Sequence, residues 1–200
     1  MPGTMTADAQ TGVETEQSDE QLMLAFARGS TAAFSELFSR YKQPLFGFFR
    51  RRLANPDHAD ELTQETFLAV FRASSYQPLA LFRTYLYAIA LKILKAHRRK
   101  SAFRAMFLGA AESEPSARET TTSEIILREA IGKLPAIDRE ILMLREFEQL
   151  NYAEIATILR LPLNTVRSRL FRARTALRDL LTSPPPLPAA SALTKFEERI

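Results

Sequence analysis

The chain has 200 residues, of which 46% are hydrophobic and 25% are charged, with a formal net charge of +4. These proportions are typical of a soluble globular protein with one large or two small domains, and they exclude collagen-like, coiled-coil and fully disordered classes. The absence of cysteine excludes disulfide scaffolds, cysteine nucleophiles and thiolate metal sites. Six glycines beside 14 phenylalanines predict an all-α fold with a core rich in Phe and Leu.

Residues 1–18 are polar, acidic and free of aromatic side chains, so we expect a disordered leader rather than a secretory signal. Charges interrupt every apolar run before it reaches the roughly eighteen residues that a membrane span requires. The sequence therefore predicts a cytoplasmic protein without membrane insertion.

Helical periodicity begins at residue 19 and continues to about residue 100, which we expect to form the first domain. Ser18 or Asp19 can cap a first helix, Ser30 a second, and Asp57 a third that runs to about Arg72. A fourth helix is expected over about 79–100. The apolar side chains of the second helix recur at three-and-four spacing and predict one buried stripe: Phe34, Leu37, Phe38, Tyr41, Leu45, Phe48, Phe49 and Leu53.

Residues 101–123 are mostly small and polar and include Gly109 and Pro115, so they are expected to be a flexible linker between two small helical domains. The second domain, 124–181, is predicted to contain four short helices with breaks at Pro135, 149–151 and 161–162. Residues 182–200 begin with a proline-rich run and are expected to form a semi-rigid tail.

A helix-turn-helix is predicted within the second domain. Asn151 and Glu154 have the spacing of a capping box that opens a short helix. After a turn at 160–162, Asn164 or Thr165 can cap a longer helix. The apolar residues of this helix fall on one side: Val166, Leu170, Ala173 and Leu177.

The opposite side of the longer helix presents Arg167, Ser168, Phe171 and Arg172. Arginine can donate two bonds to guanine, serine can bond a base or a phosphate, and an apolar ring can contact a thymine methyl group. Reading of duplex DNA is therefore one interpretation, and an ordinary helical hairpin with a solvated basic face is the other. Phe171 favours DNA, because a large apolar side chain directed away from the core requires a partner.

The helix expected over 57–72 carries a stripe of mostly acidic side chains at helical spacing: Asp57, Asp60, Glu61, Gln64, Glu65 and Leu68. The stripe is either a solvated surface or a docking face for a basic partner helix.

No carboxylate occurs from residue 66 to residue 111, whereas eight cations accumulate there: Arg72, Arg83, Lys92, Lys95, Arg98, Arg99, Lys100 and Arg104. Phe82, Tyr85 and Tyr87 are interleaved with them, a combination that can stack unpaired bases and follow a phosphate backbone. The pattern predicts binding of single-stranded nucleic acid. Core packing is the alternative for the two tyrosines, and a membrane-surface patch is disfavoured for the cations because no amphipathic anchor adjoins them.

The two histidines, His58 and His97, are 39 positions apart and no ligand set accompanies them. The sequence also contains no phosphate-binding loop, nucleophile elbow or dinucleotide fingerprint. We therefore predict no metal, no cofactor and no catalytic site.

The residues described above resemble the extracytoplasmic-function (ECF) sigma factors of the sigma-70 family over about 19–181. The resemblance rests on AFARGSTAAFSELFSRY, HADELTQETFLAVF, FRTYLYAIA with the later RRK, and LPAIDREILMLREFEQLNYAEIATILRLPLNTVRSRLFRARTALRDLL. The last phrase is similar to region 4 of the family, and DELTQETF to its core-binding helix in region 2.

The resemblance implies a non-catalytic subunit that binds core RNA polymerase and directs promoter recognition, DNA melting and initiation. It assigns polymerase binding to Asp60, Glu61, Gln64, Glu65 and Leu68. It assigns the single-stranded minus-10 element to Phe82, Tyr85, Tyr87, Lys92, Lys95, Arg98 and Arg99. It assigns the duplex minus-35 element to Thr165, Arg167, Ser168, Phe171 and Arg172, and it implies an anti-sigma factor as a further partner.

The chain departs from the family's Trp-Leu-x-x-Ile-Ala-Arg-Asn by carrying Tyr85, Leu91 and Lys92 at the Trp and Arg-Asn positions. One alternative hypothesis is a helix-turn-helix regulator that acts without being a polymerase subunit. Another is a recombinase-type enzyme, although no surrounding residues supply a nucleophile site.

Overall fold

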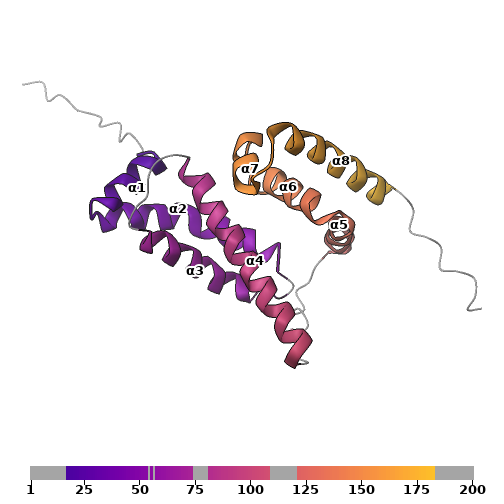
Figure 1. Cartoon of the computed structure of the whole chain (residues 1–200), viewed down its shortest axis with the longest axis horizontal. Helices are drawn as coiled ribbons and strands as arrows, with labels where there is room; N and C mark the ends of the chain where they lie inside the picture. The colour runs from indigo at the N-terminus through magenta and orange to yellow at the C-terminus, as the bar shows by residue number, and fades with distance from the viewer. Residues whose placement is uncertain (1–16, 54, 56, 74–80, 109–120, 183–200) are drawn as a thin grey trace, which may run out of the picture.

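The computed structural model describes residues 17–53, 55, 57–73, 81–108 and 121–182, and the regular elements of these residues are all α-helices. Helices α1–α4 form an N-terminal domain and α5–α8 a C-terminal domain (Figure 1). Their bounds are α1 (Asp19–Ala27), α2 (Thr31–Arg50), α3 (His58–Arg72), α4 (Phe82–Leu108), α5 (Thr122–Lys133), α6 (Ala136–Glu146), α7 (Tyr152–Leu159) and α8 (Leu163–Thr182). The all-α, two-domain expectation is confirmed. The expected leader lies almost wholly outside the described residues, as do the tail beyond residue 182 and most of the linker.

The first two helices begin at the predicted caps. Ser18 Oγ accepts from the Gln21 N–H, and the Gln21 side chain accepts from the Ser18 N–H, which completes a capping box. Ser30 caps α2 through the backbone of the first turn. The prediction for Asp57 is wrong, because its side chain makes no capping bond. Its own N–H instead donates to Asn55 Oδ1 at 2.9 Å, so the turn before α3 is held from the residue two positions earlier.

The predicted stripe of α2 forms the centre of the N-terminal core. Leu37, Leu45, Phe48 and Phe49 are fully buried between α1, α3 and α4, and the other members of the stripe pack against them while partly exposed. The rings of Phe48 and Phe49 meet edge to face with centroids 5.1 Å apart. This geometry adds attraction between the rings to the gain from burial, so the aromatic core fixes the positions of α3 and α4.

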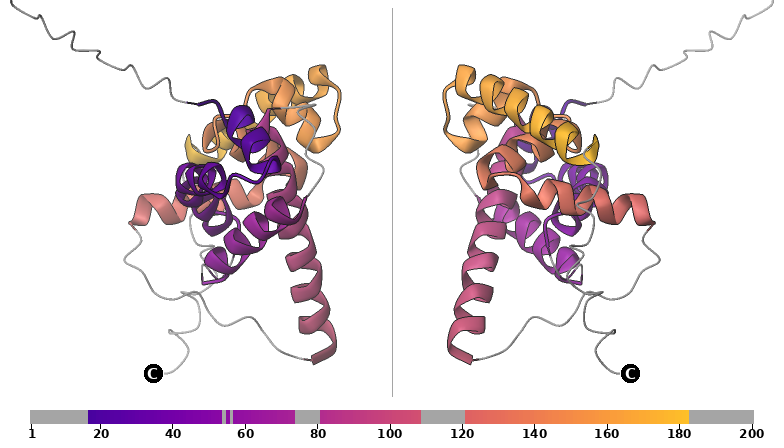
Figure 2. Two further views of the ribbon diagram at one scale, coloured as in Figure 1. Left: turned by 90° about the vertical axis from the view of Figure 1, so that its left-hand side faces the viewer. Right: turned by 90° about the vertical axis from the view of Figure 1, so that its right-hand side faces the viewer.

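Helix α4 is longer than predicted, because it continues from Lys100 to Leu108 instead of giving way to a linker at residue 101. Residues 101–108 contain Ala, Arg, Met, Leu and Phe with no glycine or proline, and the first three of these types rank among the best helix formers. Figure 2 shows this last part of α4 extending beyond the body of the molecule. At the other end of the helix, the Phe82 N–H donates to Glu20 Oε1 at 2.9 Å, so α1 supplies an anionic cap to α4.

The C-terminal domain contains the four predicted helices with breaks at the predicted positions. The capping box of Asn151 and Glu154 is present, with bonds of 3.0 and 2.7 Å. The predicted caps of the last helix are wrong: α8 begins at Leu163, so Asn164 and Thr165 lie inside its first turn. The Pro162 carbonyl accepts the Val166 N–H, and this bond starts the helix earlier than a side-chain cap would.

The tight turn between α7 and α8 is closed by backbone bonds. Arg160 adopts a left-handed conformation with φ 54°, and the Leu161 N–H donates to the Ala156 carbonyl at 3.0 Å, as in a Schellman motif. Val166, Leu170 and Ala173 are then buried on the inner side of α8, as predicted, and Leu177 is partly buried. The turn and this apolar side together fix which side of α8 faces solvent.

Candidate polymerase and nucleic-acid interfaces

The acidic stripe predicted on α3 is an exposed surface, here called the acidic surface. It consists of Asp60, Glu61, Gln64, Glu65 and Leu68, all of which are exposed. Gln64 donates to Asp60 Oδ2 at 2.6 Å, and His58 Nδ1 lies 3.3 Å from Glu61 Oε2. The side chain of Leu68 is 50% exposed. The surface therefore presents anionic oxygens beside an apolar end, which suits a basic partner helix.

The opposite side of α3 explains why this stripe faces outward. Leu62, Phe67 and Val70 are buried in the N-terminal core. The hydroxyls of Thr63 and Thr66 are also buried, and each donates to the backbone carbonyl four residues earlier at 2.7 Å. Because this side of α3 is buried and both of its hydroxyls have hydrogen-bond partners, the carboxylates on the opposite side face solvent.

Phe71 extends the acidic surface and was not predicted as a site residue. It is about as exposed as Leu68, and its ring contacts Phe26 and Phe34 with centroids 5.3 Å away in each case. The signal in the sequence was its place three residues after Leu68, one turn further along the same side of the helix.

The residues of α4 that were predicted to bind single-stranded nucleic acid divide into exposed cations and aromatic side chains that are partly or fully buried. Lys92, Lys95 and Arg99 are exposed, as is Arg98, whose guanidinium also donates to the Arg52 carbonyl at 2.8 Å. Partial burial lowers the pKa of Arg98 from its usual value. Tyr85 is partly buried. The cations can therefore reach a phosphate backbone in this structure.

Two aromatic residues expected at that site lie in the core instead. Phe82 is 0% exposed and its ring meets Tyr41 edge to face at 5.5 Å. Tyr87 is 3% exposed, and its ring lies 5.5 Å from that of Phe48. Neither ring can stack on a base in this arrangement, because α4 directs both toward other helices. At the departure Leu91, the side chain is likewise buried, whereas Lys92 faces solvent.

The outer side of α8, here called the recognition face, is fully formed. Arg167, Ser168, Phe171 and Arg172 are exposed, and Thr165 is partly buried beside them. Phe171 is 71% exposed although it stands in the middle of a helix. Ser168 donates to the Thr165 carbonyl at 3.1 Å, and the Arg167 guanidinium lies 6.0 Å from the centre of the Tyr152 ring.

Two further arginines of α8 are engaged with α6 of the same domain. Arg169 pairs with Asp138 at 2.8 Å and Arg174 with Glu146 at 2.6 Å, and both bonds tie α8 to α6. The bond to Glu146 raises the pKa of Arg174. Arg169 and Arg174 thus help to position the helix, whereas Arg167, Arg172 and Arg178 are exposed to solvent.

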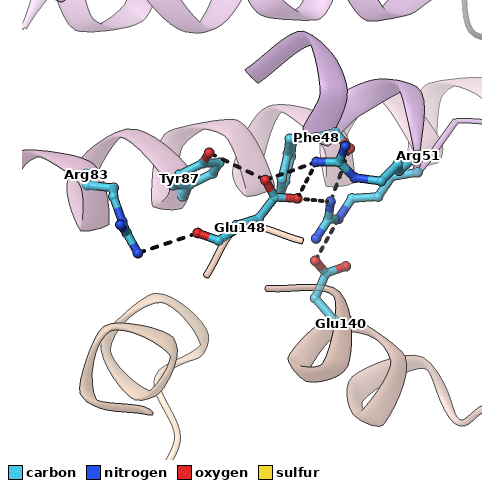
Figure 3. A network of polar contacts seen from close by, with 7 residues as sticks. Phe48, Arg51, Arg83, Tyr87, Glu140 and Glu148 are labelled. Atoms are coloured by element: carbon cyan, nitrogen blue, oxygen red, sulfur yellow. Dashed lines mark hydrogen bonds and ion pairs between the residues drawn. The ribbon is translucent and has the colours of Figure 1, made fainter. Parts of the chain in front are cut away.

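A network of polar side chains joins the two domains (Figure 3). The carboxylate of Glu148, from the turn after α6, accepts hydrogen bonds from Arg51 at 3.0 Å and from Arg52 at 2.9 Å. The Tyr87 hydroxyl donates to the same carboxylate at 3.4 Å. Burial and the Glu148 charge raise the pKa of this hydroxyl, which therefore keeps its proton.

Further bonds surround this carboxylate. Arg52 Nε binds Glu140 at 2.9 Å, and Arg83 donates to the Gln149 carbonyl at 2.8 Å. Thr84 lies 3.3 Å from the carboxylate of Glu154. The partners are separated by 61 or more residues in the chain, so no local pattern in the sequence could have revealed the network.

Among the described residues, no group of three or more His, Asp or Glu side chains is arranged to hold a metal ion, although folding brings the ring centres of His58 and His97 to 5.0 Å from each other. No helix within the described ranges is long and apolar enough to cross a membrane.

Comparison with known families matches both domains. Residues 37–104 match the family model for sigma-70 region 2, and residues 124–177 match the model for sigma-70 region 4. The first match covers the acidic surface and most of α4, and the second covers most of α5–α8, including the recognition face.

Individual relatives match over most of the chain. It is 34% identical to the RNA polymerase sigma-H factor of Pseudomonas aeruginosa over 184 residues, which is 84% of this chain and 95% of the relative. It is 33% identical to the ECF RNA polymerase sigma-E factor of Escherichia coli K12, covering 80% and 92% of the two chains. The solved structure of CnrH in complex with the cytosolic domain of CnrY is similar with a TM-score of 0.66 and 26% identity, over 82% of this chain and 97% of that one.

Proposed function

The chain belongs to the sigma-70 family of RNA polymerase sigma factors, in the ECF group, and from this premise we propose which surface carries each step of initiation. As a sigma factor it binds core RNA polymerase and promoter DNA and directs promoter-specific transcription. We propose which residues make each of these contacts and which further partner the chain binds.

The acidic surface of α3 is the proposed docking site for core RNA polymerase. Five exposed side chains on one side of a rigidly packed helix offer charge and shape to a basic helix of the polymerase. Because the opposite side of α3 is buried, polymerase can bind here without disturbing the N-terminal core.

The recognition face of α8 is proposed to read the minus-35 element in duplex form. The exposure of Phe171 carries this assignment, because a ring that is 71% exposed between polar side chains of the recognition face gains by contacting a thymine methyl group. Arg167 and Arg172 flank it and can donate to base edges or phosphates.

The exposed cations of α4 are proposed to hold the melted minus-10 strand through its phosphates: Lys92, Lys95, Arg98 and Arg99. Tyr85 is the aromatic residue of the expected set with part of its surface exposed, so it is the proposed stacking partner for an unpaired base. Phe82 and Tyr87 are assigned to the core, because both rings pack against other helices of the N-terminal domain.

The chain is proposed to act in the cytoplasm, to be non-catalytic and to need no cofactor, with the polymerase supplying all bond-forming chemistry. An anti-sigma factor is a proposed further partner. A sigma factor named RpoE from Bartonella quintana, whose fold is similar with a TM-score of 0.64, was solved in complex with the anti-sigma factor NepR.

Runoff transcription with core polymerase tests these assignments. Replacing Asp60, Glu61 and Glu65 by their amides should abolish core binding, while binding of a minus-35 duplex by the free protein should not fall. Glu36→Gln is the matched control, because this exposed carboxylate of α2 lies on another helix and pairs with Arg40 one turn away. If the triple amide variant binds core polymerase as the control does, the assignment of the acidic surface is wrong.

A further inference from the structure

The last two turns of α4 expose apolar side chains beyond the body of the protein. Phe103, Met106 and Phe107 are 61%, 79% and 63% exposed. The two phenylalanine rings lie one helical turn apart and contact each other, with centroids 4.5 Å apart and planes tilted by 34°. Figure 2 shows this end of α4 extending away from the other helices. Exposed apolar surface concentrated in this way indicates a binding partner.

Cations and a further aromatic residue lie on the same side of α4 as these rings. Positions three, four or seven residues apart share one side of an α-helix, and six residues of α4 are related by these intervals. They are here called the aromatic-cationic row: Tyr85, Lys92, Lys95, Arg99, Phe103 and Phe107. The three cations are exposed and have no ion-pair partner among the described residues, and Tyr85 is partly buried. The row therefore has cations in its middle and aromatic rings at both ends.

The charge and the length of the row match an unpaired nucleic-acid strand. No carboxylate occurs from residue 66 to residue 111, so the row attracts an anionic partner. Its 22 intervals of about 1.5 Å span about 33 Å, the length of about ten stacked nucleotides at about 3.4 Å each. A phenylalanine ring can stack on any base whose face is free, whereas in a duplex the neighbouring base pairs cover these faces.

Two other partners fit the end of α4 less well. Burying three apolar side chains in a bilayer gains less free energy than burying one myristoyl chain, which alone anchors a protein only marginally. In a symmetric dimer through this surface, the exposed cations Arg99, Lys100 and Arg104 of two copies would face each other. Three side chains also fall short of the roughly 800 Å² per partner that a stable protein interface buries.

We propose that Phe103 and Phe107 form a second stacking site for the melted DNA strand, at the far end of the cations that hold its phosphates. This assignment rests on the proposed role of α4 in binding that strand. Because Phe82 and Tyr87 are buried, the end of α4 supplies the exposed rings that its beginning does not. The strand is then held by stacking at both ends of the row and by charge between them.

Binding of a labelled thymidine oligonucleotide to the full chain, followed by fluorescence anisotropy, tests the stacking site. Replacing both rings by leucine, Phe103→Leu with Phe107→Leu, keeps apolar side chains but removes the aromatic faces. Affinity for the single strand should fall about fivefold or more. The slope of log affinity against log salt concentration should not change, because no charge is removed.

Two control variants make this result specific. Replacing both rings by tyrosine keeps the aromatic faces and should leave the affinity within about twofold of wild type. Ile126→Ala removes an apolar side chain of similar exposure on α5 and should have no effect on strand binding. Circular dichroism verifies that the helices remain in each variant. If the double leucine variant binds the strand as tightly as the double tyrosine variant does, the stacking site is refuted.

A fluorescent probe at the site gives a second, independent measurement. The chain contains no tryptophan, so Phe107→Trp introduces a single one at an exposed position. Its emission should be quenched by the single strand, because the indole stacks on a base, and much less by a duplex of the same sequence. Bound strand without quenching would contradict the proposal. A blue shift with vesicles of equal parts phosphatidylcholine and phosphatidylserine, without quenching by the strand, would assign the site to lipid instead.

These outcomes are distinguishable from failure of the proposed function. If Lys95→Ala weakens strand binding but the double leucine variant does not, the cations of α4 keep their assignment and the stacking site is wrong. If the wild-type protein does not start transcription with core polymerase, the proposed function is wrong. The affinity and quenching measurements use only the protein and the strand, so their result would stand in that case.

Discussion

Helices α4 and α8 both carry arginines or lysines toward a proposed DNA partner, but they present them in different ways. The recognition face of α8 is exposed apart from the partly buried Thr165, and Arg169 and Arg174 behind it are engaged by α6. On α4 the cations are exposed while Phe82 and Tyr87 are buried, and the side toward α7 is covered. The difference teaches that α8 offers cations and an aromatic ring together on one exposed side, whereas α4 offers exposed cations and keeps two of its aromatic rings in the core.

The largest predicted effect concerns Phe82. If this residue belongs to the core, Phe82→Ala should lower the free energy of unfolding by about 3–5 kcal/mol, measured by urea denaturation. The control is Phe171→Ala, which should change stability by less than about 0.5 kcal/mol because the ring is exposed. A stable Phe82→Ala variant with impaired binding of single-stranded minus-10 DNA would instead assign Phe82 to DNA and break the comparison.

The second prediction concerns Arg172 of α8, which is expected to contact a base. Arg172→Ala should cost about 1–3 kcal/mol of binding at one base position of the minus-35 element and should relax discrimination there, with unchanged stability. Fluorescence anisotropy on duplexes substituted one position at a time measures this. Arg178→Ala, at an exposed arginine one and a half turns further along α8, is the matched control. Equal losses on every duplex would show that Arg172 contacts only phosphate.

The third prediction concerns Lys95 of α4, an exposed cation that is expected to contact phosphate instead of a base. Lys95→Ala should weaken binding of single strands of any sequence and reduce the slope of log affinity against log salt concentration by about one. A titration at several salt concentrations with two unrelated strands gives both quantities. Sequence-dependent loss would mean that α4 reads bases through this lysine, and the contrast with α8 would then disappear.

The smallest effect is expected at Arg160, in the turn that sets the orientation of α8. Its left-handed conformation is unfavourable for residues other than glycine, so Arg160→Gly should stabilise the C-terminal domain by up to about 1 kcal/mol. Thermal unfolding followed by circular dichroism measures the change. Ala153→Gly, at an exposed position inside α7, should destabilise by a similar amount. Destabilisation by both glycines would indicate that the Arg160 side chain itself supports the turn.

The sequence predicted several elements correctly because their signals are local. The caps at Ser18, Ser30 and Asn151 depend on residues at most three positions away. The buried side of α8 follows from helical spacing alone. The end of α4 was wrong by eight residues because small residues after Lys100 suggested a linker, although no residue before Gly109 breaks a helix.

The predicted sites also differ in how far local signals in the sequence could place them. Charge and helical spacing placed the acidic surface and the recognition face on the correct sides of their helices, and the structure finds them exposed. Spacing could not distinguish an aromatic ring that faces DNA from one that faces the core. Phe82 and Tyr87 were expected at a DNA site for that reason, and only their packing against Tyr41 and Phe48 shows where they lie.

By itself the sequence determined the helical class, the two domains, the helix-turn-helix and the family resemblance, because each depends on spacing within one helix or on motifs continuous in the chain. The tertiary structure alone decided that Glu148 meets Arg51 and Arg52, from which it is separated by 97 and 96 residues. Contacts over such separations arise from the packing of whole helices. The charge of one segment does not indicate which distant residue it will bind.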